Sequence, residues 1–178
     1  MTHDYVLGLG SCLNNPHSQI QKAIDKISFL GSVIAVSRSY ETEPMLPTDY
    51  TGPKHNPYIN AAVRCQSHLA PQDLLKQCAL IEQQLGRSSI EKGLYLPRCI
   101  DIDILLCDQR MIHLPQLVIP HPLFWQRAFA IWPAADCWAD WCHPLFRDSL
   151  TERKSQLQSM TSFNSKQMLT CTNFSVSF

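Results

Sequence analysis

An apolar run that contains two aspartates, residues 97–106, constrains the fold of this chain more than any other stretch. The run is rich in isoleucine and leucine, which favours a β-strand, and successive side chains of a strand point to opposite faces. Asp101 and Asp103 are therefore expected on one face, with their Cβ atoms roughly 6.5 Å apart. The isoleucines around them face a core, so the sequence predicts a half-buried strand that presents two neighbouring carboxylates.

Such a pair of carboxylates is typical of a cation site. Adjacent carboxylates repel each other, and burial strengthens the repulsion. A bound cation removes this conflict, and oxygen ligands suit Mg²⁺, which completes its shell with water and substrate phosphates. Arg98, close ahead of Asp101, offers a planar guanidinium that suits a phosphate. The alternative is that the pair faces solvent and binds nothing, because an Asp-x-Asp motif is short.

The composition indicates one globular domain without bulk electrostatic binding. The chain has 178 residues, of which 45% are hydrophobic, and this length is sufficient for one core. Lys+Arg and Asp+Glu both number 15, so the net charge is zero. Nucleic acid and anionic membranes are therefore not expected as partners, and a phosphate ligand must be held by local charge.

The first residues predict a cytoplasmic protein. They lack a basic region, and the apolar run that follows is too short for a signal peptide. No stretch approaches the ~18 apolar residues of a membrane span. The eight cysteines are accordingly expected to be reduced.

Periodicity and turn residues predict the order β-α-β-β-α-β. The expected strands are residues 5–9, 32–42, 58–66 and 97–106, the small strands are 111–112 and 117–119, and the helices begin near 16, 71 and 120. This order fits an α+β, ferredoxin-like core with an antiparallel sheet, helices on one face and a C-terminal helix ending at residue 133. The other sheet face, with long loops at 43–57 and 87–96, would receive a ligand.

The C-terminal residues 151–178 form a polar tail. Ser, Thr, Gln and Asn dominate it and aliphatic residues are few, which is typical of disorder. Its last residues alternate between apolar and polar from Phe174 to Phe178, which instead favours a weak edge strand. Both interpretations stay open at the level of the sequence.

Six separated motifs occur in register between residues 5 and 133. They are Gly10-Ser11-x-Leu13, Tyr40-x-Thr42-x-Pro44, Tyr58-x-Asn60-Ala61-Ala62-Val63, Ile81-Glu82-x-x-Leu85-Gly86-Arg87, Pro97-Arg98-x-x-Asp101-x-Asp103-Ile104-Leu105 and Ile119-Pro120-His121-Pro122, the last followed by Arg127 and Phe129. With this combination the chain resembles 6-hydroxymethyl-7,8-dihydropterin pyrophosphokinase, a kinase of folate biosynthesis. The resemblance implies a catalytic domain over residues 1–150.

The resemblance also implies the reaction and its residues. ATP would give its β,γ-diphosphate to the hydroxymethyl group of the dihydropterin by in-line attack, with AMP released and two Mg²⁺ ions held by Asp101 and Asp103. The implied catalytic residues are Arg87, Arg98, Asp101 and Asp103. The implied ATP-binding residues are Glu82, Arg98, Ile104, His121 and Arg127. The implied pterin-binding residues are Thr42, Pro44, Leu46, Tyr58, Asn60, Tyr95 and Phe129.

The loop at residues 87–96 departs from the family pattern. It carries fewer arginines than is usual, Tyr95 and Leu96 stand in place of a Trp-Gly pair, and Cys12 replaces an Asn after the first motif. Lysine does not replace an arginine fork, so we predict near-normal substrate affinity with reduced turnover. The alternative is a paralogue that binds pterin or nucleotide without catalysis. The expected partners are small molecules, and an association with dihydropteroate synthase is not readable from the sequence.

Overall fold

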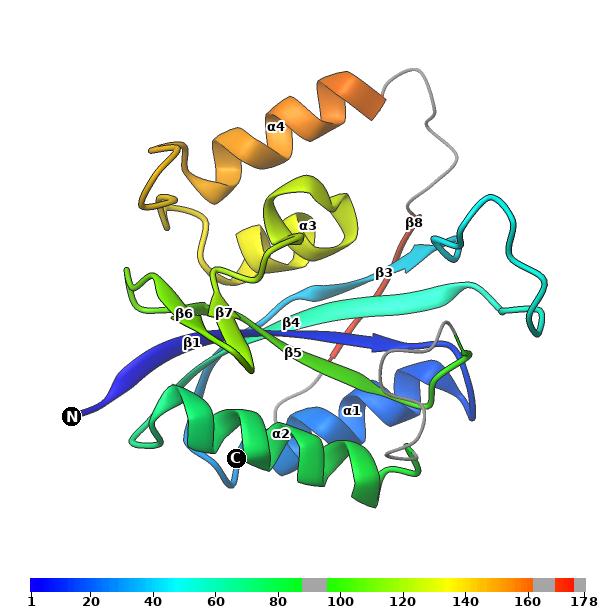
Figure 1. Ribbon diagram of the computed structural model, residues 1–178, viewed down its shortest axis with the longest axis horizontal. Helices are drawn as coiled ribbons and strands as arrows, with labels where there is room; N and C mark the ends of the chain where they lie inside the picture. Colours follow the sequence, from blue (N-terminus) through cyan, green and yellow to red (C-terminus); the bar gives the residue numbers. More distant parts are fainter. Residues whose placement is uncertain (88–95, 162–168, 175–178) are drawn as a thin grey trace.

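An antiparallel sheet forms the centre of the computed structural model, which describes residues 1–87, 96–161 and 169–174. Its strands are β1 (His3–Ser11), β2 (Ser32–Val36), β3 (Arg38–Thr42), β4 (Tyr58–Ser67), β5 (Asp101–Cys107) and β8 (Leu169–Asn173). They lie in the order β5-β1-β4-β3-β8, with β2 also paired to β4 (Figure 1). This arrangement confirms the predicted ferredoxin-like core.

Two helices, α1 (Pro16–Ile27) and α2 (Pro71–Gln84), cover one face of this sheet (Figure 1). Helix α1 begins where the sequence predicted, because the Asn15 side chain accepts a hydrogen bond from the Ser18 backbone N–H and Pro16 takes the first helical position. The apolar residues at helical spacing are buried against the sheet; they are Ile20, Ala23, Ile24 and Ile27. The main core therefore lies between the sheet and these two helices.

The opposite face of the sheet is partly covered as well, which the sequence did not predict. Helices α3 (Ala128–Cys137) and α4 (Leu150–Thr161) lie beyond this face (Figure 1). A second apolar cluster joins Val6, Ala62 and Leu105 of the sheet to Phe124 and Ile131. The prediction of one helix-covered face is therefore wrong, and the space for a ligand is the part that α3 leaves free.

Several element boundaries differ from the prediction, and the strand expected at 97–106 begins only at Asp101. The strand expected at 32–42 is divided at Ser37, whose N–H donates to the Ala62 carbonyl and whose hydroxyl accepts from the Ala62 N–H. The third helix starts at Ala128 rather than at residue 120, because a 3₁₀ turn at Phe124–Gln126 and an extended Arg127 precede it. It then continues past Pro133 to Cys137, since the apolar packing outweighs the lost backbone hydrogen bond.

The polar tail is also more ordered than its composition suggests. Helix α4 occupies residues 150–161, and β8 pairs antiparallel with the free edge of β3. Ser149 and Glu152 form a reciprocal cap, in which the Ser149 N–H donates to Oε2 at 2.7 Å and the Glu152 N–H donates to the Ser149 hydroxyl at 3.1 Å. Residues 150–161 and 169–173 are therefore regular structure rather than disordered, and the last four residues of the predicted edge strand, 175–178, lie outside the described residues.

The remaining described elements are a short hairpin of β6 (Ile112–Leu114) and β7 (Leu117–Ile119).

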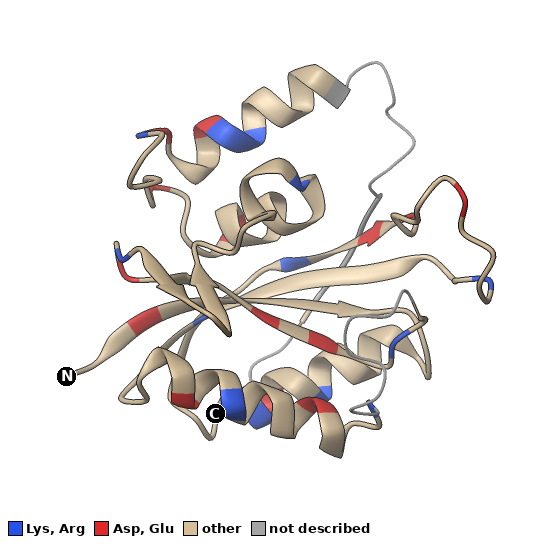
Figure 2. Ribbon diagram, viewed as in Figure 1, with Lys and Arg blue, Asp and Glu red and all other residues tan. Residues whose placement is uncertain are grey.

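Charged residues are spread over both helical layers and the sheet, in keeping with the zero net charge (Figure 2). Two acidic positions nevertheless lie close together on β5 (Figure 2). Among the described residues, no helix combines the length and the apolar character that crossing a membrane requires.

Asp136 of α3 binds side chains of β3 and α4, and these contacts are expected to stabilise the folded protein. Its carboxylate accepts from Arg38 at 3.0 Å, from the Tyr40 hydroxyl at 2.7 Å and from Lys154 of α4 at 3.1 Å. Burial alone would raise the pKa of Asp136, but these hydrogen bonds outweigh it and lower the pKa. The stabilisation is therefore complete above the ordinary value of 3.8 and is lost as the pH falls below it.

We expect Asp136→Asn to lower the free energy of unfolding by about 1–3 kcal/mol at pH 7. Urea unfolding of the variant and the wild-type protein at pH 7 and pH 3 measures the difference, which should shrink at the lower pH. Asp140→Asn, at an exposed position, is the matched control. A difference of equal size at both pH values would contradict the role of the ionised carboxylate.

Candidate active site

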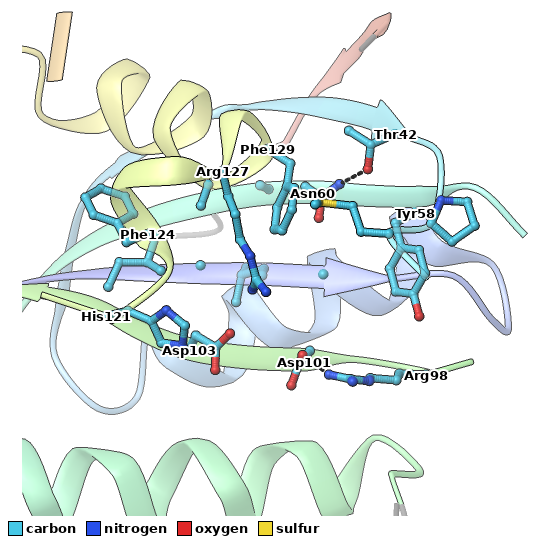
Figure 3. Close-up of a pocket in the computed structure, with 18 of the residues that line it drawn as sticks. Thr42, Tyr58, Asn60, Arg98, Asp101, Asp103, His121, Phe124, Arg127 and Phe129 are labelled. Carbon is cyan, nitrogen blue, oxygen red and sulfur yellow. Dashed lines mark hydrogen bonds and ion pairs between the residues drawn. The ribbon is translucent and has the colours of Figure 1, made fainter. Parts of the chain in front are cut away.

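A pocket opens over the part of the sheet that α3 leaves uncovered (Figure 3). Strands β1, β4 and β5 form its floor, residues 42–46 at the end of β3 form one wall, and residues 121–130 form another. Gly8 and Gly10 lie in the floor, so the middle strand carries no side chain there. A flat ligand can therefore approach the backbone of β1 closely.

The strand register decides which side chains stand beside this floor. Gly10 of β1 pairs with Asn60 of β4 on one side and with Asp101 of β5 on the other. Gly8 pairs in the same way with Asp103. Residues directly opposite across neighbouring strands point to the same face, so Asn60 and Asp101 face the pocket across Gly10, roughly 10 Å apart at two strand spacings.

Asp101 and Asp103 project from the pocket face of β5, as the strand period predicted (Figure 3). One oxygen of Asp101 accepts from Arg87 and the other accepts from Arg98. Within the described parts of the chain, Asp103 makes no hydrogen bond or ion pair. Asp101 is therefore neutralised by protein side chains, whereas Asp103 is not.

The pKa of Asp103 reflects this isolation. Its side chain is exposed to the pocket, and the pocket walls replace part of the water around it. This desolvation, followed by repulsion from Asp101, raises the pKa of Asp103, while the positive charges of His121, Arg87 and Arg98 oppose the rise. An uncompensated carboxylate beside a second one offers the kind of oxygen ligands that a hard divalent cation such as Mg²⁺ prefers.

Three of the residues that the sequence implied lie away from the pocket, under β5. Glu82 is 3% exposed, and its Oε1 accepts from the Ile102 N–H at 2.8 Å and from Arg87. Arg87 is buried as well, between Glu82 and Asp101. Ile104 lies in the core beneath the sheet. Tyr95, which the resemblance assigned to pterin binding, lies outside the described residues.

The opposite half of the pocket is aromatic and carries an amide. The rings of Tyr58 from β4 and Phe129 from α3 project into it (Figure 3). Asn60 donates through Nδ2 to the Thr42 hydroxyl at 2.9 Å, and its Oδ1 faces the space above Gly10. This subsite therefore offers ring surfaces for stacking and a hydrogen-bond acceptor. The expected residues Pro44 and Leu46 complete its wall.

Side chains that offer N–H donors lie above the carboxylates. His121 stands beside Asp103, and the Arg127 side chain extends toward β5 (Figure 3). Together with Arg98 they surround the aspartate pair with donors for phosphate oxygens. The structure thus brings eleven of the implied residues into one pocket: Thr42, Pro44, Leu46, Tyr58, Asn60, Arg98, Asp101, Asp103, His121, Arg127 and Phe129.

Sequence reasoning missed several lining residues, among them His55, Phe124 and Met45. His55 is buried, and its imidazole contacts the hydroxyls of both Tyr50 and Tyr58. A single histidine in a proline-rich loop carries no periodicity and no motif spacing. Only the fact that this loop is unusually long pointed toward the site.

Residues 6–139 match the family model of 7,8-dihydro-6-hydroxymethylpterin-pyrophosphokinase (HPPK). The chain belongs to this family. It is 40% identical to a Porphyromonas gingivalis 2-amino-4-hydroxy-6-hydroxymethyldihydropteridine pyrophosphokinase over 141 residues, which cover 78% of this chain and 92% of that protein. It is 36% identical to the Pseudomonas aeruginosa HPPK of the same name over 73% of this chain and 77% of that protein.

Solved structures of the HPPK family have the same fold. A crystal structure of Plasmodium falciparum HPPK-DHPS matches 96% of this chain with a TM-score of 0.76 and 15% sequence identity. At this identity the likeness concerns the fold alone. The chain covers 49% of that protein, and it likewise covers 26% of an Arabidopsis thaliana folate synthesis bifunctional protein, to which it is 37% identical.

Proposed function

We propose that this HPPK-family chain transfers diphosphate from ATP to the hydroxymethyl group of 6-hydroxymethyl-7,8-dihydropterin and releases AMP, as a step of folate biosynthesis. The observation that carries the proposal is the pairing of Gly10 with both Asn60 and Asp101. It sets a ring-binding subsite and a carboxylate pair side by side on one sheet. A pterin that lies over Gly10 then has its hydroxymethyl group directed toward the phosphates.

The pterin subsite would act by stacking and by hydrogen bonding. Tyr58 and Phe129 supply ring faces for a flat heterocycle. Asn60 Oδ1 accepts an N–H from the pterin edge, and the hydrogen bond from Asn60 to Thr42 fixes the orientation of the amide. No observation favours the alternative of a paralogue that binds without catalysis.

The phosphate subsite would act by charge. We propose that Asp101 and Asp103 hold two Mg²⁺ ions, which supply charge neutralisation for the phosphates when bound. Arg98, His121 and Arg127 place further positive charge and hydrogen-bond donors at the same end of the pocket. Residues 42–46 would limit the access of water, a competing acceptor of the phosphoryl group.

The decisive experiment measures AMP release from ATP and Mg²⁺ as hydroxymethyl-dihydropterin is titrated. We expect saturable, pterin-dependent AMP, no AMP without the pterin, and loss of the signal in Asp101→Ala. ATP turnover that does not respond to the pterin would instead indicate another phosphotransferase.

The rate of this reaction is a separate prediction. Because the loop at 87–96 carries few arginines, we expect turnover to be slower than that of the Pseudomonas aeruginosa relative under matched conditions, with pterin affinity similar within a few-fold. Steady-state kinetics of the two proteins provide the comparison. Equal turnover numbers would refute it.

Phe129→Ala tests the stacking wall. We expect the KM for the pterin to rise about 10-fold or more, because one ring face is lost, while the KM for ATP stays within about twofold. Phe146→Ala is the matched control, since Phe146 is 56% exposed and stacks on Trp125 outside the pocket. An equal rise in both KM values would contradict a role confined to the pterin.

A further inference from the structure

The hydroxyl of Tyr58 is held from one side by His55. The Nδ1 atom of His55 lies 3.0 Å from this hydroxyl, and the two rings stack with centroids 5.9 Å apart. The other ring nitrogen, Nε2, lies 3.1 Å from the Tyr50 hydroxyl. His55 is 7% exposed, so these contacts fix the imidazole inside the protein rather than at its surface.

We propose that His55 is a positioning residue for the diphosphoryl transfer, which fixes the orientation of the Tyr58 ring in the wall of the pocket. The inference rests on the proposed function, because it assigns His55 a role in binding the pterin. A tyrosine ring anchored only at Cβ can rotate and swing. The contact of its hydroxyl with His55 and the stacking of the two rings remove this freedom before the ligand arrives, so less conformational entropy is lost on binding.

Two substitutions of His55 separate its two contacts. Asparagine places a polar atom near the position of Nδ1 and so keeps a partner for Tyr58. Glutamine places its polar atoms near Nε2, which keeps the contact with Tyr50 and loses the contact with Tyr58. We expect H55Q to weaken pterin binding about fivefold to tenfold, and H55N to restore most of the loss.

The measurement is a fluorescence titration of 6-hydroxymethylpterin, supplemented by steady-state KM values for both substrates. The KM for ATP should stay within about twofold in both His55 variants, and the melting temperature reports any general loss of folding. His113→Gln, the same substitution at an exposed position on β6, should leave every value unchanged. Equal effects of H55N and H55Q, or an equal change in the KM for ATP, would overturn the proposal.

A double-mutant cycle with Tyr58→Phe tests the route. If His55 acts through the hydroxyl, H55Q should have little additional effect on pterin binding once this hydroxyl is absent. The full effect of H55Q in the Y58F background would overturn the proposal. If H55Q is too unstable to titrate, Y58F alone still tests the route, because loss of the hydroxyl should weaken pterin binding about as much as H55Q is expected to. Unchanged pterin binding in Y58F would overturn the proposal.

Failure of the wild-type protein to release AMP would refute the proposed function but leave the binding cycle interpretable.

Discussion

Replacing Asp103 by asparagine is expected to abolish turnover while making the metal-free protein more stable. The activity should fall by at least about 100-fold, because a preorganised charge at the phosphates is lost. The gain in stability follows from the raised pKa of Asp103, whose main cause is desolvation and whose second cause is the neighbouring Asp101. An ionised carboxylate in this position opposes folding, and asparagine removes that charge.

The sign of the pH dependence follows from the same shift. The folded state binds the Asp103 proton more tightly than the unfolded state does, so stability is lost as the pH rises through the interval between the ordinary value of 3.8 and the raised value. The stabilisation by Asp103→Asn should therefore be present at pH 7 and absent below pH 3.8. Melting temperatures measured in a metal chelator test this, and about 1 kcal/mol corresponds to roughly 2–4 °C in a chain of this size.

Asp101→Asn is the informative contrast. Its activity should fall as severely, but its stability should decrease, because Arg87 and Arg98 each lose the negative charge that they bind. Two aspartates two positions apart on one strand would then have opposite effects on stability. Asp140→Asn, at an exposed position, controls for the substitution itself. A loss of stability in both aspartate variants, or retained activity in either, would contradict this account of the pair.

The parts of the site that the sequence predicted correctly depend on short-range geometry. The period of two along a strand is enough to place Asp101 and Asp103 on one face and Ile102 on the other. The pairing of Asn60 and Asp101 across Gly10 could not be obtained in this way. It depends on the register between three strands that are distant in sequence, and only the folded sheet fixes that register.

The failures share a physical cause, which is tertiary packing that local patterns do not contain. Helix α4 has little apolar periodicity, yet its lysine and arginine side chains bind Asp136 and the Trp125 carbonyl. Pro133 marks the end of a helix by its local chemistry, but α3 continues because its apolar residues are buried against the sheet. His55 gave no pattern at all, since its role exists only through its contacts with two tyrosines.

Glu82 is the implied nucleotide-binding residue whose observed surroundings least resemble a ligand pocket. The family resemblance implied contact with the nucleotide, whereas the side chain is 4% exposed and lies beneath β5, bound to Arg87 and to the Ile102 N–H. In this arrangement Glu82 positions neighbouring groups of the pocket without facing the pocket itself. It holds the backbone of β5 between the two aspartates and holds the arginine that neutralises Asp101.

We therefore expect Glu82→Ala to lower the free energy of unfolding by about 3–5 kcal/mol, because a buried arginine loses one of its anionic partners and a buried N–H loses its acceptor. Glu82→Gln keeps an oxygen for the Ile102 N–H and should cost about 1–3 kcal/mol. Urea unfolding measures both, with Gln83→Ala on the exposed face of α2 as the control. In the folded fraction of either variant, kcat should fall more than the KM for ATP rises, since Arg87 is no longer fixed against Asp101. A variant of normal stability with only a raised KM for ATP would instead favour direct contact between Glu82 and the nucleotide.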